Sequence, residues 1–411
     1  MSKQTMQAGQ PQKANQQENK VQTGQPQEGI SQMENLQIEQ QAVDWLSLLI
    51  KQAQMHPAME PQDVYKIMFQ AVFGAEHLLA DQQAAYRYFI REYDVVQPQE
   101  MYLYEPIQEN VCRINFGAWK QEGLPGEWLF RMFADSVSTG IIPEKEPSTR
   151  YEQFTQYEKA AEAAVKSGIF SFSEKEWKDY RQSYYAKSSD GCTPYAVHHS
   201  EHYRSVEQPA YRLVSTAYLR CMPVLKKLTE LKAVADRENR MLVVAIDGRC
   251  ASGKTTVAEQ LSRITGAGIV HMDDFFLPAN LRTDKRLAEP GGNVHYERFY
   301  EEVLPRLGDR SEFGYHRFDC SKMQLGENVI VPAGTKDGFV RVVEGAYSLH
   351  PYFGEYADIR VFSQVEKEEQ LRRIANRDGE AVLFTFREKW IPMEETYFKA
   401  FSIRESADMV I

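Results

Sequence analysis

The chain has 411 residues, of which 43% are hydrophobic, so it is long enough for two or three domains with packed cores. Its formal net charge of −10 excludes a general binder of nucleic acids or anionic membranes, because such proteins need a basic face that displaces counterions. No apolar stretch approaches the roughly 20 residues of a membrane helix. The start of the chain also lacks the apolar region of a secretory signal peptide, and the five cysteines form no CxxC pair. We therefore expect a cytoplasmic protein with reduced cysteines, without a membrane or nucleic-acid partner.

The first segment, residues 1–41, carries glutamine at about every third position and almost no aromatic side chains. A segment of this composition cannot bury enough apolar surface to offset the entropy of ordering it. We therefore expect a disordered, glutamine-rich tail.

Residues 42–235 contain aromatic-rich stretches with apolar side chains at helical spacing, and few strand-like runs interrupt them. This pattern predicts a mainly α-helical domain, and no motif in it indicates a reaction. Three of the nine histidines, His198, His199 and His202, lie within five residues, but their spacing matches no zinc pattern. Metal binding, an anion or substrate pocket, and ordinary packing or surface roles all stay open for them. His77 and Arg113 are further polar residues within apolar stretches, and either could contribute to such a pocket.

From residue 236 to residue 411, short apolar runs alternate with helical stretches. We expect strands at 242–246, 268–272, 340–343, 358–362 and 408–411. This alternation is typical of a parallel sheet with helices on both faces. A charged helical segment at 225–240 leads into the first of these strands, so the sequence predicts an α/β domain that follows the helical one.

A phosphate-binding loop directly follows the strand at 242–246. Residues 248–256 read GRCASGKTT, which is the pattern of two glycines with four residues between them, followed by lysine and a hydroxyl residue. The glycines let backbone N–H groups turn toward phosphates, Lys254 reaches the β- and γ-phosphates, and the hydroxyl of Thr255 can hold Mg²⁺. The alternative is a glycine-rich turn that only joins a strand to a helix. We assign the nucleotide contacts to Gly248, Ala251, Ser252, Gly253, Lys254, Thr255 and Thr256.

Acidic residues follow two later strands, at the sheet edge where ligands of such folds bind. Of Asp273 and Asp274, one can orient a substrate hydroxyl and take its proton, while the other acts on Mg²⁺ through water. Helix capping is the alternative for this pair. Glu344 comes directly after the strand at 340–343, where a second acidic group can support the metal, or where the chain simply turns.

Two arginines, Arg373 and Arg377, lie four residues apart and would share one helix face. On a mobile cover they could close over the transferring phosphoryl group, and a solvated helix with ordinary charges is the alternative. A turn-rich insert at 282–299 follows the strand that carries the aspartates. It predicts an acceptor pocket formed by Arg282, His295, Tyr296 and Arg298, unless these are surface residues.

Taken in order, GRCASGKTT, MDDFF, VVEGAY and RRIANRD resemble the uridine kinase family of P-loop kinases, over about residues 240–411. The resemblance implies an α/β kinase fold, ATP or GTP with Mg²⁺ as cofactors, and a hydroxyl of a small metabolite, foremost a nucleoside, as acceptor. It also implies the roles of individual residues: Asp273 as the base, Lys254 and Thr255 as ligands of phosphate and Mg²⁺, Glu344 as the second acidic group, and Arg373 and Arg377 as the lid.

On the substrate side the chain departs from the family pattern. Residues 315–322 read YHRFDCSK where uridine kinases carry a tyrosine, a phenylalanine and a His-x-Arg element. Tyr315 remains an acceptor-site candidate, but this departure leaves the acceptor itself open.

The sequence as a whole predicts an ATP- and Mg²⁺-dependent small-molecule kinase. Two other functions stay open: a nucleotide-sensing regulatory protein in which the kinase-like half switches the helical domain, and a bifunctional enzyme whose helical domain carries a second activity. A monomer and a homo-oligomer are both compatible with the sequence.

Overall fold

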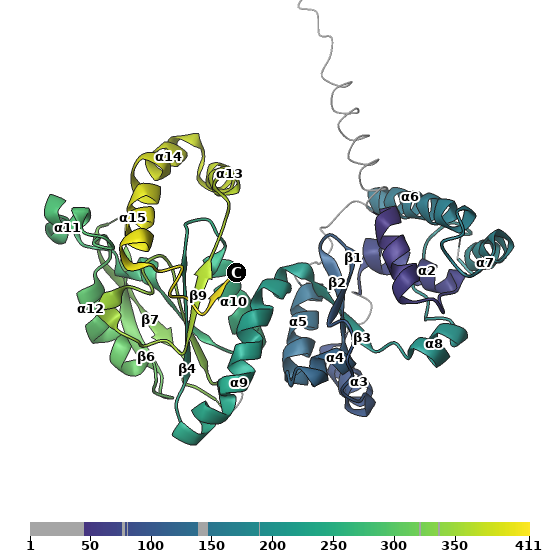
Figure 1. Cartoon of the computed structure of the whole chain (residues 1–411), viewed down its shortest axis with the longest axis horizontal. Helices are drawn as coiled ribbons and strands as arrows, with labels where there is room; N and C mark the ends of the chain where they lie inside the picture. Colours follow the sequence, from purple (N-terminus) through teal and green to yellow (C-terminus); the bar gives the residue numbers. More distant parts are fainter. Residues whose placement is uncertain are drawn as a thin grey trace, which may run out of the picture.

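The computed structural model describes residues 45–75, 79, 81–138, 147–188, 190–319, 322–335 and 338–411. The predicted disordered tail at 1–41 and His77 lie outside these residues. Figure 1 shows two parts side by side, with the N-terminal helices and a small sheet in one and a larger sheet in the other. Within the described residues, no helix combines the length and the apolar character needed to cross a bilayer.

Helices dominate the N-terminal part, as predicted. They are a helical stretch at 45–55, α2 (Pro61–Phe73), α3 (Gln82–Val95), α4 (Phe116–Gln121), α5 (Gly126–Ser138), α6 (Pro147–Lys166), α7 (Glu174–Ala186) and α8 (Glu201–Glu207). α2 starts where proline stands in its first turn, and Glu60 and Asp63 cap it reciprocally. Its apolar residues at helical spacing face an aromatic cluster in which Tyr65 contacts Trp177 and Tyr184.

A three-stranded antiparallel sheet, which the sequence analysis missed, completes this part. Its order is β1 (Tyr104–Gln108), β2 (Val111–Asn115) and β3 (Tyr211–Ser215). The strands have five residues each, and β3 pairs with β2 although about a hundred residues separate them in the chain. Such a short and distant pairing leaves no local signal, because the hydrophobic pattern of five residues fits a helix and a strand alike.

The C-terminal part is built on a five-stranded parallel sheet in the order β10-β9-β4-β8-β5. The strands are β4 (Leu242–Gly248), β5 (Gly268–His271), β8 (Val340–Glu344), β9 (Ile359–Ser363) and β10 (Met409–Val410), so all five expected strands are confirmed. The helices of this part are α9 (Met222–Glu238), α10 (Lys254–Thr265), α11 (Asp284–Ala288), α12 (Tyr296–Glu302), α13 (Lys367–Asp378), α14 (Glu380–Thr385) and α15 (Ile391–Phe401).

An antiparallel hairpin of β6 (Phe313–Asp319) and β7 (Gln324–Val331) stands apart from the parallel sheet. The sequence around Tyr315 predicts part of the acceptor site, and its pattern does not predict this hairpin.

The central strand β4 is buried along its whole length and faces two cores. Val244 and Ile246 belong to a core that continues into the N-terminal part, whereas Val243 and Ala245 face a second core under α12 and α15. α5 packs against α10, and Arg131 of α5 donates a hydrogen bond to the carbonyl of Ile264 (3.2 Å). The two parts therefore share apolar packing, and the predicted domain boundary at 235/236 falls in the last turn of α9.

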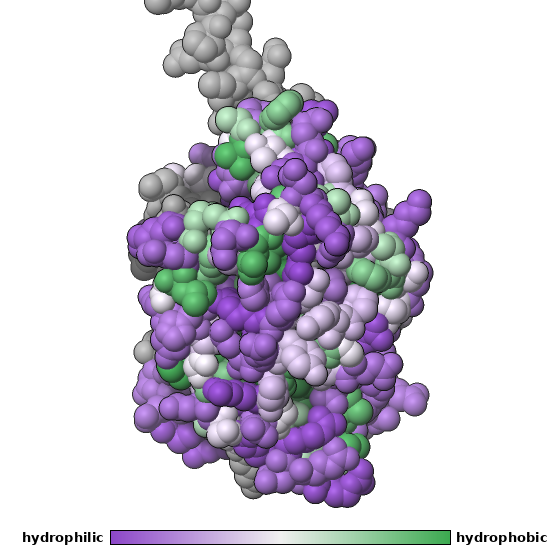
Figure 2. All heavy atoms as spheres, turned by 90° about the vertical axis from the view of Figure 1, so that its left-hand side faces the viewer, coloured by the Kyte–Doolittle hydropathy of each residue, from purple (hydrophilic) through white to green (hydrophobic). Residues whose placement is uncertain are grey.

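The outer face of the C-terminal part is largely hydrophilic. Figure 2 looks at this face and shows apolar patches of limited extent among polar side chains. Isolated exposed apolar residues of this kind are normal for a folded protein.

A buried carboxylate holds the end of β4 against the segment that follows β8. Asp247 is fully buried and accepts hydrogen bonds from the N–H groups of Gly248 (2.7 Å), Tyr347 (3.2 Å) and Leu349 (2.9 Å) and from the hydroxyl of Tyr397 (2.8 Å). Because one side chain satisfies four donors from three segments, it positions the edge of the sheet where the phosphate loop begins.

Replacing Asp247 should destabilise the fold strongly. Asp247→Ala leaves four buried donors without an acceptor, so we expect the free energy of unfolding to fall by about 3–5 kcal/mol in chemical denaturation. Glu355, an exposed carboxylate, provides the control: Glu355→Ala should change stability by no more than about 0.5 kcal/mol. Equal stability of the two variants would contradict this role of Asp247.

Candidate active site

The phosphate loop has the backbone geometry that its glycines predict. Gly248 has a φ of 133°, and a Cβ there would lie 2.2 Å from the carbonyl oxygen of Ser363. Gly253 has a φ of 92° and directly precedes α10. Both positions require glycine, one for close backbone contact and the other for its conformation. The loop thus ends at a helix N-terminus, where N–H groups and the helix dipole favour phosphate.

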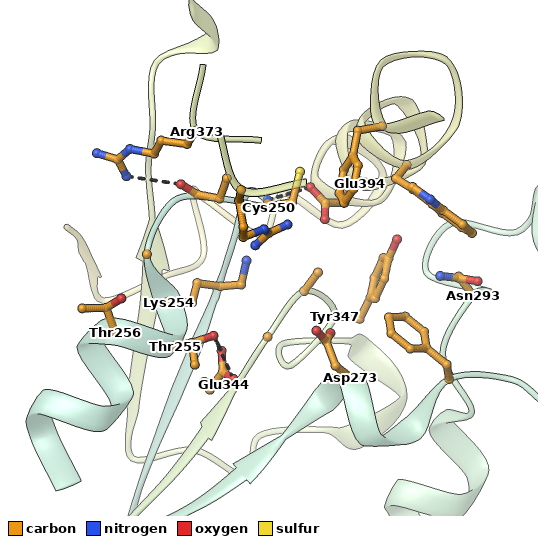
Figure 3. Close-up of a pocket in the computed structure, with 18 of the residues that line it drawn as sticks. Cys250, Lys254, Thr255, Thr256, Asp273, Asn293, Glu344, Tyr347, Arg373 and Glu394 are labelled. Atoms are coloured by element: carbon orange, nitrogen blue, oxygen red, sulfur yellow. Dashed lines mark hydrogen bonds between the residues drawn. The ribbon is translucent and has the colours of Figure 1, made fainter. Parts of the chain in front are cut away.

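Lys254 and Thr255 lie at the start of α10, facing the loop and the neighbouring strand end. The ammonium group of Lys254 donates to the carbonyls of Gly248 (2.8 Å) and Arg249 (2.9 Å). The hydroxyl of Thr255 lies 3.2 Å from both carboxylate oxygens of Glu344. Figure 3 shows Lys254 pointing into the cavity, with the Thr255–Glu344 pair below it.

A cavity of about 650 Å³ opens in front of the loop, which is within the usual size of small-molecule sites. The loop contributes Cys250, Ala251, Gly253, Lys254, Thr255 and Thr256, and the rest of the lining comes from Asp273, Phe276, Arg282, Asn293, Met323, Glu344, Gly345, Ala346, Tyr347, Arg373, Arg377, Phe386, Trp390 and Glu394. Most of the predicted loop residues, the base candidate, the second acidic group and both lid arginines therefore border one space.

The two neighbouring aspartates face different surroundings. Asp273 points into the cavity (Figure 3) and is open to solvent, but the atoms packed around it and the nearby Glu344 carboxylate raise its pKa. Asp274 is buried outside the lining and accepts hydrogen bonds from the Tyr315 hydroxyl (2.9 Å) and from Nε of Arg317 (3.2 Å). Asp273, the predicted base, therefore borders the cavity in front of the phosphate loop, whereas Asp274, predicted to act on the metal, does not line it.

The side chains at Glu344 suit a magnesium ion. Thr255 and Glu344 offer hydroxyl and carboxylate oxygens, and Asp273 lines the same cavity, which is the hard oxygen chemistry that Mg²⁺ prefers. His271, which the sequence analysis assigned no role, lies with Nδ1 2.5 Å from Oε1 of Glu344, and this bond raises its pKa. Among the described residues, no group of three or more acidic, histidine or cysteine side chains forms a metal cage. This agrees with a site at which one or two carboxylates and the phosphates share the ion.

The lid arginines lie on α13 above the loop. Nη1 of Arg373 donates to the carbonyl of Ala251 (3.2 Å), and its Nε contacts Glu369 (2.7 Å). Arg377 is paired with Asp378 (2.7 Å) and also lines the cavity. Both guanidinium groups are thus close to the position expected for the transferred phosphate.

Most of the predicted acceptor residues support the fold instead of lining the cavity. Of these candidates only Arg282 borders it. His295 caps α12, Tyr296 stacks on His350 with ring centroids 4.8 Å apart, and Arg298 donates to the carbonyls of His316 (2.9 Å) and Asp274. Tyr315 contacts Asp274. These four side chains do not line the cavity, because a helix cap, a ring contact and hydrogen bonds elsewhere in the fold hold them, and sequence position alone does not show such contacts.

The acceptor side is lined by residues that the sequence analysis did not single out. They include Phe276, Asn293, Tyr347, Phe386, Trp390 and Glu394. Phe386 and Trp390 are the two ends of a π-helical turn before α15, and such turns are frequent at functional sites. Glu394 is buried and its Oε2 accepts the N–H of Cys250 in the loop (2.9 Å).

Arg220 reaches the loop from outside the region of resemblance. It lies in the short 3₁₀ helix η2 (Thr216–Cys221), which follows β3 of the N-terminal sheet. Its guanidinium donates to the carbonyl of Ser252 (3.1 Å) and to the hydroxyl of Ser363 (3.1 Å). Burial and the positive charge of Arg373 lower the pKa of Arg220. The two arginines lie on adjoining sides of the loop, at the carbonyls of Ala251 and Ser252.

Among the described residues, His198, His199 and His202 belong to no group of side chains that could hold a metal ion. His199 is buried between Asp63 (2.6 Å) and the hydroxyl of Tyr211 (2.7 Å), and burial lowers its pKa to about 4. His198 and His202 are exposed. The metal interpretation is therefore unsupported within the described residues.

The ionisation of Glu394 should make stability depend on pH. Burial raises its pKa from 4.5 to about 7, so between these values the folded chain binds a proton that the unfolded chain has lost. The free energy of unfolding must then fall as pH rises through this window. Glu394→Gln cannot titrate at this position, so it lacks this loss of stability. In urea titrations, the free energy of unfolding of Glu394→Gln minus that of wild type should therefore increase by about 3 kcal/mol between about pH 5 and about pH 8. Glu355→Gln, at an exposed position, is the control. If the free energies of unfolding of Glu394→Gln and wild type differed by the same amount at both pH values, the raised pKa would not belong to Glu394.

Arg220 should matter for nucleotide affinity although it lies outside the loop. Arg220→Ala removes a hydrogen bond to the loop carbonyl of Ser252 and one to Ser363 of the adjoining strand β9, so we expect the Kd for ATP to rise at least about tenfold in calorimetric titrations. Arg237, an exposed arginine on α9, is the matched control, and Arg237→Ala should leave the Kd unchanged. Unchanged ATP affinity in Arg220→Ala would show that the loop keeps its geometry without this contact.

Part of the chain is similar to known kinases. No protein-family model matches the chain. Among curated proteins, the chain is 28% identical over 154 residues to a cytidylate kinase of Pyrobaculum arsenaticum. The matched residues make up 36% of this chain and 67% of that kinase. A cytidylate kinase of Pyrobaculum aerophilum is 27% identical over 154 residues, with the same shares of both chains.

Two solved structures were also found to be similar. A protein described as a possible uridine kinase, from Bacillus stearothermophilus, has 22% identity and a TM-score of 0.32, and the match covers 42% of this chain and 88% of that one. A protein described as a fructose transport system kinase, from Silicibacter sp. TM1040, has 20% identity and a TM-score of 0.38, covering 48% of this chain and 98% of that one. The parallel sheet, the phosphate loop and the helices on both faces make the C-terminal half an α/β P-loop fold, as predicted.

Proposed function

We propose that this chain is a kinase that transfers the γ-phosphoryl group of ATP to a hydroxyl group of a small metabolite, foremost a nucleoside. One observation carries the proposal: Asp273 faces the same cavity as the phosphate loop and the lid arginines. A protein that only senses a nucleotide needs no carboxylate opposite the phosphates. A base opposite a phosphate loop is what phosphoryl transfer to a hydroxyl requires.

In the proposed reaction, the acceptor oxygen attacks the γ-phosphorus and the bond to the β–γ bridging oxygen breaks. ADP leaves with that oxygen, and the proton of the acceptor hydroxyl passes to Asp273. The raised pKa of Asp273 favours this proton transfer over that of an ordinary aspartate. Lys254 and the loop N–H groups hold the phosphates in line, and Arg373 and Arg377 offset the charge of the transferring group.

Magnesium, when bound, neutralises charge on the phosphate oxygens, and Thr255 with Glu344 would hold it. His271 orients Glu344 through their hydrogen bond, as a residue behind a metal ligand commonly does. The lid also excludes water, which would otherwise compete with the acceptor.

The acceptor side supports a molecule with a flat apolar part and polar edges. Phe276, Tyr347 and Trp390 offer aromatic surfaces, while Asn293 and Arg282 offer hydrogen-bond donors. A nucleoside base has both properties, because its faces stack on aromatic rings and its edges form hydrogen bonds. A sugar would use the polar groups but would leave more of the aromatic surface unused.

The proposal predicts acceptor-dependent turnover of ATP that specific variants abolish. ADP formation with Mg²⁺ should rise when the right member of a panel of nucleosides, pantothenate, sugars and sugar phosphates is added. Asp273→Asn should lower kcat by about 10²–10⁴-fold because the base is lost, and Lys254→Ala by about 10²–10³-fold because the phosphates lose a cation.

Two exposed residues on α11 serve as controls: Asp284→Asn and Lys285→Ala should retain full activity. Full turnover in Asp273→Asn would remove the assigned base. Tight ATP binding that no acceptor converts into turnover would favour the nucleotide-sensing alternative instead.

A further inference from the structure

Two neighbouring aspartates follow β5, and they differ in how they are held. Both belong to the short 3₁₀ helix η3 (Met272–Phe275). Three residues complete one turn of such a helix, so adjacent side chains point about 120° apart. Asp273 lines the cavity in front of the phosphate loop and accepts no hydrogen bond from any residue that the structure describes, whereas Asp274 is buried outside the lining. The direction of Asp273 is therefore set by the backbone of η3 and not by hydrogen bonds of its own.

Two side chains of the β6–β7 hairpin hold the carboxylate of Asp274. The hydroxyl of Tyr315 donates to Oδ2 (2.9 Å), and Nε of Arg317 donates to Oδ1 (3.2 Å). Tyr315 is only 2% exposed, so its hydrogen bond is shielded from water. Arg317 is held from the other strand, because its Nη1 donates to Glu327 of β7 (3.0 Å). Both carboxylate oxygens of Asp274 are thus bound to one antiparallel hairpin.

Arg298 of α12 holds the backbone of the same aspartate. Its Nη2 donates to the carbonyl of Asp274, and its Nη1 donates to the carbonyl of His316 on β6 (2.9 Å). The guanidinium carbon lies 4.2 Å from the ring centre of Phe275. Hydrogen bonds from a charged donor are stronger than those between neutral groups. η3 is therefore attached to the hairpin through both the side chain and the carbonyl of Asp274.

We propose that Asp274 is a positioning residue: its bonds to the hairpin fix η3 so that the neighbouring Asp273 faces the acceptor. This inference rests on the proposed kinase function, in which Asp273 takes the proton of the acceptor hydroxyl. A hydrogen bond donated directly to Asp273 would favour its charged form and weaken it as a base. Anchoring through the next residue avoids this loss and still fixes the base, and a displacement of about 1 Å can lower a rate about 10²-fold.

Steady-state kinetics of the full chain with ATP, Mg²⁺ and the acceptor that supports turnover test the proposal. Asp274→Ala removes both side-chain bonds, so kcat should fall about 10–100-fold while KM for ATP changes by less than about twofold. Asp274→Asn keeps an oxygen for the Tyr315 hydroxyl and should retain more activity than Asp274→Ala. Counting ATP-binding sites by calorimetry and expressing kcat per site excludes unfolded chains, which a purely structural role would produce.

Two single-hydroxyl variants make the comparison specific. Tyr315→Phe removes one bond to Asp274 and should lower kcat per site at least about threefold. Tyr356 is the matched control, because its hydroxyl donates to the carbonyl of Ser348 (2.6 Å) in the same half of the chain. Tyr356→Phe should leave kcat within about twofold of wild type. If Asp274→Ala does not fold, Tyr315→Phe carries the test, and unchanged kcat per site in the folded variants would overturn the proposal.

Crystal structures separate this inference from the proposed function. If the wild-type chain shows no acceptor-dependent turnover, the kinase function fails, and the structures of the wild type and of a folded Asp274→Ala or Tyr315→Phe chain test the positioning of Asp273 by themselves. The proposal predicts that the Asp273 carboxylate faces the cavity in the wild type and is displaced in the variant. An Asp273 carboxylate that keeps its position in the variant would overturn it.

Discussion

The close contact between β4 and β9 at the end of β4 is the constraint on which the site depends. Only glycine fits at position 248, because any Cβ would meet the backbone of Ser363. This contact turns the chain out of the sheet at its carboxyl edge, and the loop that follows presents its N–H groups at the start of α10. Asp247, one residue earlier, binds the segment after β8 to the same edge, so Glu344 and the loop keep a fixed relative position.

The two halves of the chain meet at this edge as well. The core on one face of β4 continues into the N-terminal part, and Arg220 extends from there to the carbonyl of Ser252. β3 leads directly into the short helix that carries Arg220. The N-terminal part is therefore structurally joined to the phosphate loop.

Local sequence patterns predicted the C-terminal fold well. The phosphate loop, the five parallel strands and the helix with Arg373 and Arg377 were predictable, because each depends on the spacing of neighbouring residues. Asp273 and Asp274 differ only in the direction of their side chains, and the partners that decide it, Tyr315 and Arg317, lie on a hairpin some forty residues away. Spacing along the chain could not separate these two aspartates.

Other features had no sequence signal because they depend on distant contacts. Glu394 and Arg220 approach the loop from residues far along the chain in either direction, and neither stands in a motif. The small sheet of the N-terminal part joins β2 to a strand about a hundred residues later, and only this pairing brings Arg113 beside Tyr211. Arg113 is visible in the sequence as a polar residue in an apolar stretch, but its burial and its hydrogen bond to Gln70 appear only in three dimensions.

The central claim is that one cavity brings the phosphates of a nucleotide and an acceptor hydroxyl together between Lys254 and Asp273. A crystal structure of the chain with Mg²⁺ and a non-hydrolysable ATP analogue tests this most directly. The account predicts phosphate oxygens within hydrogen-bond distance of the loop N–H groups and Lys254, a metal ion at Thr255, and Asp273 facing the γ-phosphate across open space. A nucleotide bound elsewhere, or phosphates pointing away from Asp273, would contradict it.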